Sequence, residues 1–423
     1  MVGWLHELRR RQQGASALEC ASESRFALVD AVVAGHVDVA VFLAEQGYAL
    51  DPSQTPRLRL CARAGNLELL EWLHARGLTR GDFGWLDEAA GAGHLHVVQW
   101  VHENLDWSVC TAGAMDQAAA DGRLELVQWL HTHRTEGCTA RAMDGAACNG
   151  HLKLVQWLHA HRTEGCTPMA MDGAARHGHL DIVQWLHAHR SEGCTTRAMD
   201  EAASNGRFAV LQWLHAHRSE GCTSDAMDRA VDRGHFEIAR WLHAHRAEGC
   251  TAKAMDYAAS HGSLELVRWL HETRSEGCTA RAMDNAAMRG HLHVVQWLHE
   301  NRTEGCSTDA MDQTGSVRVL RWLREHRSEG CTRFATDYAV QTENVEKLLF
   351  LRDEGLLACA PSTVSRAAGC RTFEALQLLR VAFPAQVDTA AIHTDYVTNG
   401  FLEMFLQFER RGQGLRDQAL QSA

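Results

Sequence analysis

The sequence predicts an all-α solenoid of about fourteen stacked helix-turn-helix units. One observation is a Met-Asp pair that recurs every 28 residues, from Met115-Asp116 to Met311-Asp312. A second is that each period holds an Ala-rich segment, a glycine and an apolar segment with helical spacing. A fixed period of about 20–50 residues is typical of arrays in which each unit buries its apolar face against its neighbours. Because such a core grows in one dimension, a chain of 423 residues can form one long array.

One copy illustrates the first half of the unit. Thr139 is expected to cap a short first helix, and Asp144 adds negative charge near the positive end of a helix. Gly150 ends this helix, whose small residues let neighbouring backbones approach closely. Arg162, expected in the last turn of the second helix, and Glu164 predict an exposed ion pair in every copy, worth about 0.3–1 kcal/mol.

The second helix is longer and more apolar. It starts near His151, a turn residue expected to hydrogen-bond the backbone. Val155 and Leu158 share one stripe, and Leu154 and Trp157 form another about 100° away. Two adjoining stripes predict contacts on two sides, so the tryptophan and its copies are expected in the core with the indole N–H bonded to a nearby carbonyl.

The repeated pattern resembles the ankyrin repeat. Its signature is carried here by Ala146, Ala147, Gly150, His151, Leu152, Val155 and Leu158. Two features differ: Arg141 to Asp144 stand where the family has Thr-Pro-Leu-His, and the unit has 28 residues instead of about 33. The missing residues follow the second helix, so the resemblance implies fingers that are shortened or absent. The Trp-Leu-His form with its Gly-Cys loop is similar to short ankyrin-type arrays of some protist and giant-virus proteins, which are interaction modules.

Five segments are predicted along the chain. Degenerate copies at both ends suit terminal units that must turn one face to water. The unit that starts at Ser307 lacks three residues around Gly315, which predicts a kink or a shift in stacking. The predicted segments are an N-terminal arm or extra helix (1–21), degenerate repeats (22–110), regular repeats (111–306), degenerate repeats (307–412) and a polar tail (413–423).

The repeated polar side chains are interpreted as structural. Nine of the fourteen cysteines share one slot, from Cys110 to Cys331. Neighbouring copies are expected about 8–10 Å apart, beyond the roughly 7 Å between Cα atoms that a disulfide spans. Histidines two apart, such as His159 and His161, point in opposite directions on a helix and cannot chelate one ion. Capping and hydrogen bonds between units explain Asp144 and its copies, so we expect no catalytic residue, metal or cofactor.

Composition bounds the partners. The formal net charge is -11, without a long basic run, which argues against nucleic acid. No stretch approaches the ~20 apolar residues of a membrane helix, and no apolar signal segment is seen at the N-terminus. We therefore expect a cytoplasmic, monomeric protein without membrane insertion, with the nucleus as an alternative location.

Comparison of the copies separates scaffold slots from variable ones. The slot after Met-Asp and the two slots before the turn glycine vary, and the resemblance places them on the concave face. These slots either drift, because exposed positions tolerate change, or form a recognition surface. Arg229 and Tyr257 are the best anchor candidates, since their residue types are enriched at interface hot spots. The predicted partner-binding residues are Glu201, Arg229, Tyr257, Asn285, Arg176, Arg233, His261 and Arg289.

The leading functional prediction is a non-enzymatic scaffold that binds a protein partner along the concave face. An alternative is an adaptor or effector-like targeting subunit that recruits substrates to an enzyme supplied in trans. A third is a helical-hairpin array without ankyrin geometry, which would keep the interaction role.

Overall fold

The computed structural model describes residues 27–46, 59–77, 79, 84–105, 110–369 and 373–385. All regular structure within these ranges is helical, which confirms the predicted all-α class. The chain divides into two units, Met1–Cys222 and Thr223–Ala423. The predicted arm (1–21), the polar tail (413–423) and the degenerate copy around residue 400 lie outside the described residues.

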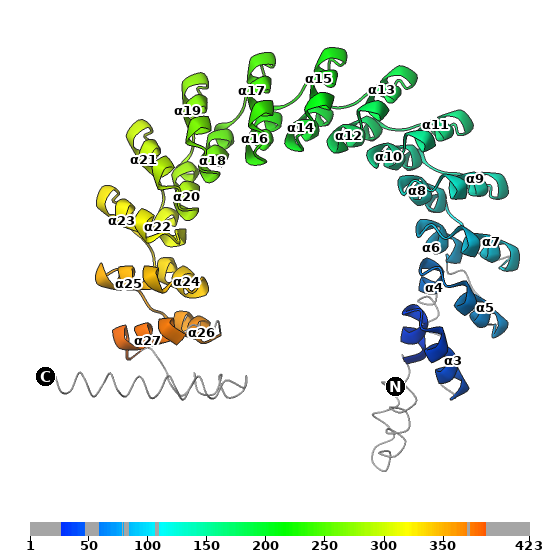
Figure 1. Ribbon diagram of the computed structural model, residues 1–423, viewed down its shortest axis with the longest axis horizontal. Coiled ribbons are helices and arrows are strands. Elements are labelled where there is room, and N and C mark those ends of the chain that lie inside the picture. The colour runs from blue at the N-terminus through cyan, green and yellow to red at the C-terminus, as the bar shows by residue number, and fades with distance from the viewer. Residues whose placement is uncertain are drawn as a thin grey trace, which may run out of the picture. The chain divides into compact units, whose positions relative to one another are not determined.

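In the first unit, first helices of 4–10 residues alternate with second helices of 9–10 residues, and the two kinds lie in two rows (Figure 1). The first helices are α4 (Leu60–Arg63), α6 (Trp85–Gly91), α8 (Ala112–Ala120), α10 (Ala140–Cys148), α12 (Pro168–His177) and α14 (Arg197–Ser204). The second helices are α3 (Val37–Glu45), α5 (Leu67–Ala75), α7 (Leu95–Asn104), α9 (Leu124–His133), α11 (Leu152–His161), α13 (Leu180–His189) and α15 (Phe208–His217).

The second unit repeats this arrangement. Its first helices are α16 (Ser224–Asp232), α18 (Ala252–Ser260), α20 (Ala280–Met288), α22 (Asp309–Gln313), α24 (Phe334–Gln341) and α26 (Pro361–Gly369). Its second helices are α17 (Phe236–His245), α19 (Leu264–Thr273), α21 (Leu292–Asn301), α23 (Val317–His326), α25 (Val345–Asp353) and α27 (Phe373–Ala382). The loops that join these hairpins contain no strand in the described residues, in line with the predicted loss of fingers.

Small residues bring the first helices together, as predicted. Helix α10 packs against α8 and α12 on its two sides and against its own partner α11. Ala142, Ala146 and Ala147 are at most 1% exposed in these contacts, and Met143 fills the space between them. The apolar spine of each unit therefore runs along its first helices, with one stripe of every second helix packed onto it.

The aspartate of each Met-Asp pair binds the next copy. Asp144 accepts two hydrogen bonds from Thr167, one from the backbone N–H at 2.7 Å and one from the hydroxyl at 2.7 Å. The same hydroxyl accepts a bond from the N–H of Met169 and so caps helix α12. The carboxylate thus lies at the positive end of the following helix, where negative charge is favourable. We call this arrangement the Asp–Thr clamp.

The clamp recurs along both units. The N–H to Oδ1 distances are 2.7–2.8 Å and the hydroxyl to Oδ2 distances 2.5–2.8 Å. Hydrogen bonding between neighbouring copies, predicted from sequence, is confirmed by these pairs. The other clamps join Asp87 to Thr111, Asp116 to Thr139, Asp172 to Thr195, Asp228 to Thr251, Asp256 to Thr279, Asp284 to Ser307 and Asp312 to Thr332.

Two further contacts tie the copy that contains His151 and Arg162 to the preceding copy. The ring of His151 lies against Gly122, whose φ of 74° and missing side chain leave room for it. The Arg162–Glu164 ion pair forms as predicted, and the guanidinium lies against Gly137. Its side chains are only 23% and 26% exposed, so the pair is half-buried and not the exposed one expected.

A buried lysine occupies the place of the three-residue deletion. Helix α22 is short, and the last carbonyls of a helix lack partners within it. Lys347 of α25 is fully buried, and its Nζ donates to the carbonyl oxygens of Met311, Asp312 and Thr314 at 3.1, 2.7 and 2.9 Å. Burial lowers the pKa of Lys347 to about 8. This contact holds the shortened helix in the stack.

We predict that Asp256→Ala destabilises the stack by about 1–3 kcal/mol, because Thr279 then loses the acceptor of both its N–H and its hydroxyl. Urea unfolding of the purified protein measures this loss. The exposed Glu272→Ala serves as the matched control and should change stability by less than about 0.5 kcal/mol. Equal unfolding midpoints for the two variants would show that the clamp contributes nothing.

We predict that Lys347→Met lowers stability by about 3 kcal/mol, because a methionine fills the space but leaves three buried carbonyl groups without a donor. Amide hydrogen exchange in α22 should accelerate in the variant. Lys153→Met, at an exposed position of α11, provides the control. A Lys347→Met protein as stable as wild type would contradict the role given to this lysine.

Candidate functional site

Several side chains that vary between copies lie on the first helices, and we call these the first-helix surface of each unit. The surface is made of four slots in each copy. They are the residue before Ala-Met-Asp, the residue after Met-Asp and the two residues before the turn glycine. In the first unit it includes Arg141, Gly145, Cys148, Met169, Gly173, Arg176, Arg197 and Glu201. In the second unit it includes Arg229, Arg233, Lys253, Tyr257, His261, Arg281, Asn285 and Arg289.

Two of the predicted partner-binding residues lie in the first unit and face each other. Arg176 Nε is 3.8 Å from Glu201 Oε2, across the gap between α12 and α14. The arginine is 55% exposed and the glutamate 18% exposed. Since a surface ion pair at this distance is weak, Arg176 can leave Glu201 and bind a partner protein at little cost in free energy.

The other predicted residues lie in the second unit. Arg229 Nη2 is 3.1 Å from Asp225 Oδ2 on its own helix. His261 reaches the preceding copy, with Nε2 2.7 Å from the carbonyl oxygen of Asp232. Tyr257 and Asn285 are half-buried, whereas the four basic residues of the set are exposed: Arg229, Arg233, His261 and Arg289.

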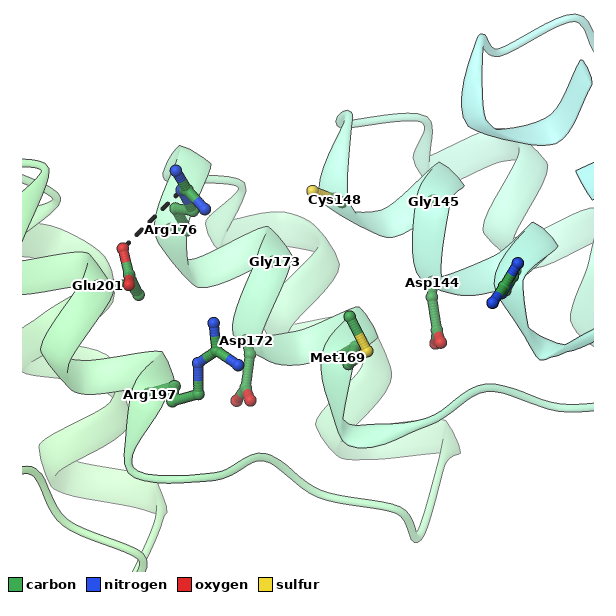
Figure 2. Close-up of a pocket in the computed structure, with 10 residues that line it drawn as sticks. Asp144, Gly145, Cys148, Met169, Asp172, Gly173, Arg176, Arg197 and Glu201 are labelled. Carbon is green, nitrogen blue, oxygen red and sulfur yellow. Dashed lines mark ion pairs between the residues drawn. The ribbon is translucent and has the colours of Figure 1, made fainter. Parts of the chain in front are cut away.

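A hollow of about 460 Å³ opens on the first-helix surface of the first unit (Figure 2). It lies over Gly145 and Gly173, which occupy the slot after Met-Asp in α10 and α12. Cys148 and Met169 add apolar lining. The remaining lining residues are Arg141, Asp144, Asp172, Arg176, Arg197 and Glu201.

Close packing keeps the hollow open. A Cβ on Gly145 would lie 2.8 Å from Ala120 Cβ, and one on Gly173 would lie 2.9 Å from Cys148 Cβ. Real Cβ atoms do not approach so closely, so no side chain of the chain itself fits at these two slots while the helices stay this close. The same slot holds Glu201 in the next copy, where a side chain is accommodated.

The carboxylates of the hollow already have partners. Asp144 accepts both hydrogen bonds of its clamp, and burial raises its pKa although Thr167 counteracts the shift. Asp172 accepts the bonds of Thr195 at 2.8 and 2.6 Å, and Glu201 pairs with Arg176. The anionic groups therefore have little capacity left for a ligand.

Three lining residues were missed by the sequence interpretation. Arg141, Met169 and Arg197 occupy the slot before Ala-Met-Asp, near the start of their helices. That slot also varies between copies, with Lys253 and Arg281 in the second unit. This variation is the signal that marks the slot, whereas the ankyrin resemblance marks residues 141–144 only as a replacement of the family's Thr-Pro-Leu-His.

A family model of ankyrin repeats, many copies, matches five overlapping segments of the chain: 138–187, 170–215, 199–243, 227–271 and 255–299. Residues 138–299 are therefore similar to ankyrin repeats. This confirms the resemblance predicted from the Ala-Ala, Gly-His and apolar-helix pattern. No curated protein matches the chain.

Solved structures that match the chain include two of the pentatricopeptide repeat protein PPR10 in complex with an 18-nt psaJ RNA element, one of them a triple cysteine-to-serine variant. Each is 11% identical, with 97% of this chain and 76% of the other covered and a TM-score of 0.46. PPR10 from maize is also 11% identical, with 89% and 65% covered and a TM-score of 0.32. Values this low do not indicate a shared partner or function.

Within each unit, tryptophans and histidines of the second helices lie next to one another. Trp157 is half-buried, which corrects the prediction of a core position. His161 stacks on it with ring centroids 4.5 Å apart and donates from Nδ1 to its carbonyl oxygen at 2.8 Å. His131 of the preceding copy meets the indole edge-on at 5.3 Å and accepts a bond from Arg162 Nη1 at 3.4 Å.

The two histidines of a copy therefore make different contacts, as their spacing predicts: one stacks on the tryptophan of its own copy and the other meets the tryptophan of the next copy. Second helices contact each other far less than first helices do, which explains why the tryptophan stripe is covered by rings instead of a packed core. In the part of the chain that the structure describes, no group of three or more His, Cys, Asp or Glu side chains could hold a metal ion. None of the described helices has the length and apolar character needed to cross a membrane.

The repeated cysteines are poor nucleophiles. Cys138 is 8% exposed, and burial raises the pKa of its thiol to about 11. All cysteines in the described residues are free thiols. Cys148, in the hollow, lies 3.5 Å from His177 Nδ1, but burial raises its pKa too. A nucleophilic thiol needs a lowered pKa, so these residues fit packing.

We predict that alkali weakens the stack through these thiols. Burial raises the pKa of Cys250 and Cys278 to about 11, from 9.0 for an unburied thiol. A raised folded-state pKa gives stability that is present below pH 9 and lost as the pH rises to about 11, by up to about 1.4 kcal/mol per pH unit for each thiol. Urea midpoints across this range, under reducing conditions, should fall less steeply for Cys250→Ala/Cys278→Ala. Identical slopes would contradict the prediction.

Proposed function

We propose that the protein is a non-enzymatic scaffold that binds a protein partner along its first-helix surfaces. The observation that carries the proposal is a pattern of slots: the clamp aspartate, the turn glycine and the spine residues repeat, while exposed slots of the first helices differ from copy to copy. Repeat arrays present extended surfaces of this kind to partners. Ankyrin repeats, matched over residues 138–299, are typical of interaction proteins.

The chemistry of the surface favours protein over nucleic acid. Two exposed arginines of this surface lie beside carboxylates, Arg229 beside Asp225 and Arg176 beside Glu201. The whole chain carries a formal net charge of -11. Nucleic acid is bound mainly by continuous positive charge along the phosphate backbone. A surface of mixed sign with a half-buried Tyr257 resembles the polar and aromatic mixture of protein interfaces.

The proposal includes a cytoplasmic or nuclear location. Free thiols occupy the same slot in copy after copy of the described residues. Such thiols persist in a reducing compartment.

Affinity capture with quantitative mass spectrometry tests the proposal. We predict that Arg229→Ala/Tyr257→Ala lowers recovery of the specific partner at least about tenfold, because hot-spot side chains contribute about 2 kcal/mol or more each. The matched control is Lys153→Ala/Arg268→Ala, at exposed positions of second helices. Both proteins should unfold at the same urea concentration as wild type.

Equal recovery with all three proteins would refute binding along the first-helix surface. Loss with the control variant alone would move the interface to the second helices.

A further inference from the structure

We propose that the hollow over Gly145 and Gly173 binds a segment of a partner protein in which an aliphatic side chain is flanked by carboxylates. This inference rests on the proposed scaffold function and assigns one part of the first-helix surface to one kind of ligand.

The shape of the hollow is specific to these copies. In the slot after Met-Asp, only α10 and α12 carry glycine among the regular copies, and the following copies carry Glu201, Arg229, Tyr257 and Asn285. The two glycines occupy adjacent copies of the stack, and both line the same space of about 460 Å³. Ligand pockets typically have about 300–1,000 Å³. The space is large enough for a bulky side chain with its neighbouring backbone.

The apolar lining of the hollow points to an aliphatic group. Met169 is 65% exposed, although its slot holds the charged Arg141 and Arg197 in the copies on either side. An exposed, unbranched thioether adapts to irregular apolar surfaces. Figure 2 shows Met169 beside the two glycines, with Cys148 on the far side of the space. An aliphatic side chain placed there would cover the methionine.

The charge balance of the hollow points to carboxylates on both sides of that group. Three carboxylates and three guanidinium groups line it, but they differ in whether they are already paired within the chain. Asp144 and Asp172 are held by their clamps, and Glu201 is paired. Arg141 and Arg197 have no ion pair and no side-chain hydrogen bond among the described residues, and they stand at slots on either side of Met169. A ligand with an acidic residue on each side of an aliphatic one complements this order.

A polyanion suits the hollow less well. Asp144 and Asp172 lie between the two arginines in the lining and would repel a continuous row of phosphates. A peptide can instead place its carboxylates at the arginines and its apolar side chain over the glycines.

Selection from a phage-displayed library of short random peptides on the full chain tests the inference. Enriched peptides should carry Leu, Ile or Met next to Asp or Glu. Arg141→Glu/Arg197→Glu should weaken a synthetic enriched peptide at least about tenfold, because reversal leaves like charges facing each other. The matched control is Arg281→Glu, at the same slot but beside Tyr257 and Asn285, and it should change the affinity less than about twofold.

A chemical footprint makes the test independent of substitutions. Cys148 lines the hollow and Cys331 lies in the second unit, and both are half-buried free thiols. The enriched peptide should slow alkylation of Cys148 and leave Cys331 unchanged, as read by peptide mass spectrometry. Equal protection, or none, would overturn the assignment.

The outcomes separate this inference from the proposed function. Two results would overturn the ligand assigned to the hollow: enrichment of peptides without acidic residues, or a peptide affinity that Arg141→Glu/Arg197→Glu leaves unchanged. The proposed scaffold function would still stand if Arg229→Ala/Tyr257→Ala removes the captured partner. If a fluorescent oligouridine displaces the enriched peptide and its own binding depends on these two arginines, the peptide assignment is overturned in favour of RNA. If the first-helix variants still bind both the enriched peptide and the captured partner, the hollow assignment and the scaffold proposal are both overturned.

Discussion

The fold depends on a carboxylate that satisfies the start of the next helix. A first helix offers unpaired N–H groups at its N-terminus, and a short helix has few other means to hold its position. In the Asp–Thr clamp, Asp144 takes the backbone and hydroxyl donors of Thr167 while the threonine hydroxyl caps α12. Local capping and contact between copies are therefore one interaction. A repeat that loses it loses both.

This arrangement frees other positions of the first helix. Once the clamp, the alanine spine and the turn glycine fix a copy, the remaining first-helix slots can change without disturbing the stack. Glycine at two of them lets α8, α10 and α12 pack closely and leaves the hollow, whereas larger residues at the same slot stand on the surface of the second unit. Variation in one slot thus alters both the packing and the chemistry that a partner meets.

Much of the fold could be predicted because the same residues recur at a fixed spacing. The helix pair, the alanine contacts and the bonds between copies all follow from residues that recur, such as Asp144 and Gly150. The tryptophan was misplaced because two apolar stripes do not say which of them meets a densely packed neighbour. Lys347 could not be predicted, since its role arises from a deletion in another copy. The variable slots were found, but the hollow was not, because it depends on distances between adjacent helices.

Amide hydrogen exchange of the capping threonines tests the central claim most directly. The N–H of Thr167, Thr195, Thr251 and Thr279 would face water in an isolated helix, but here each donates to a carboxylate at 2.7–2.8 Å. The account predicts that these amides exchange as slowly as those inside the first helices. Exchange as fast as that of exposed loop amides would show that the copies are not joined by this contact.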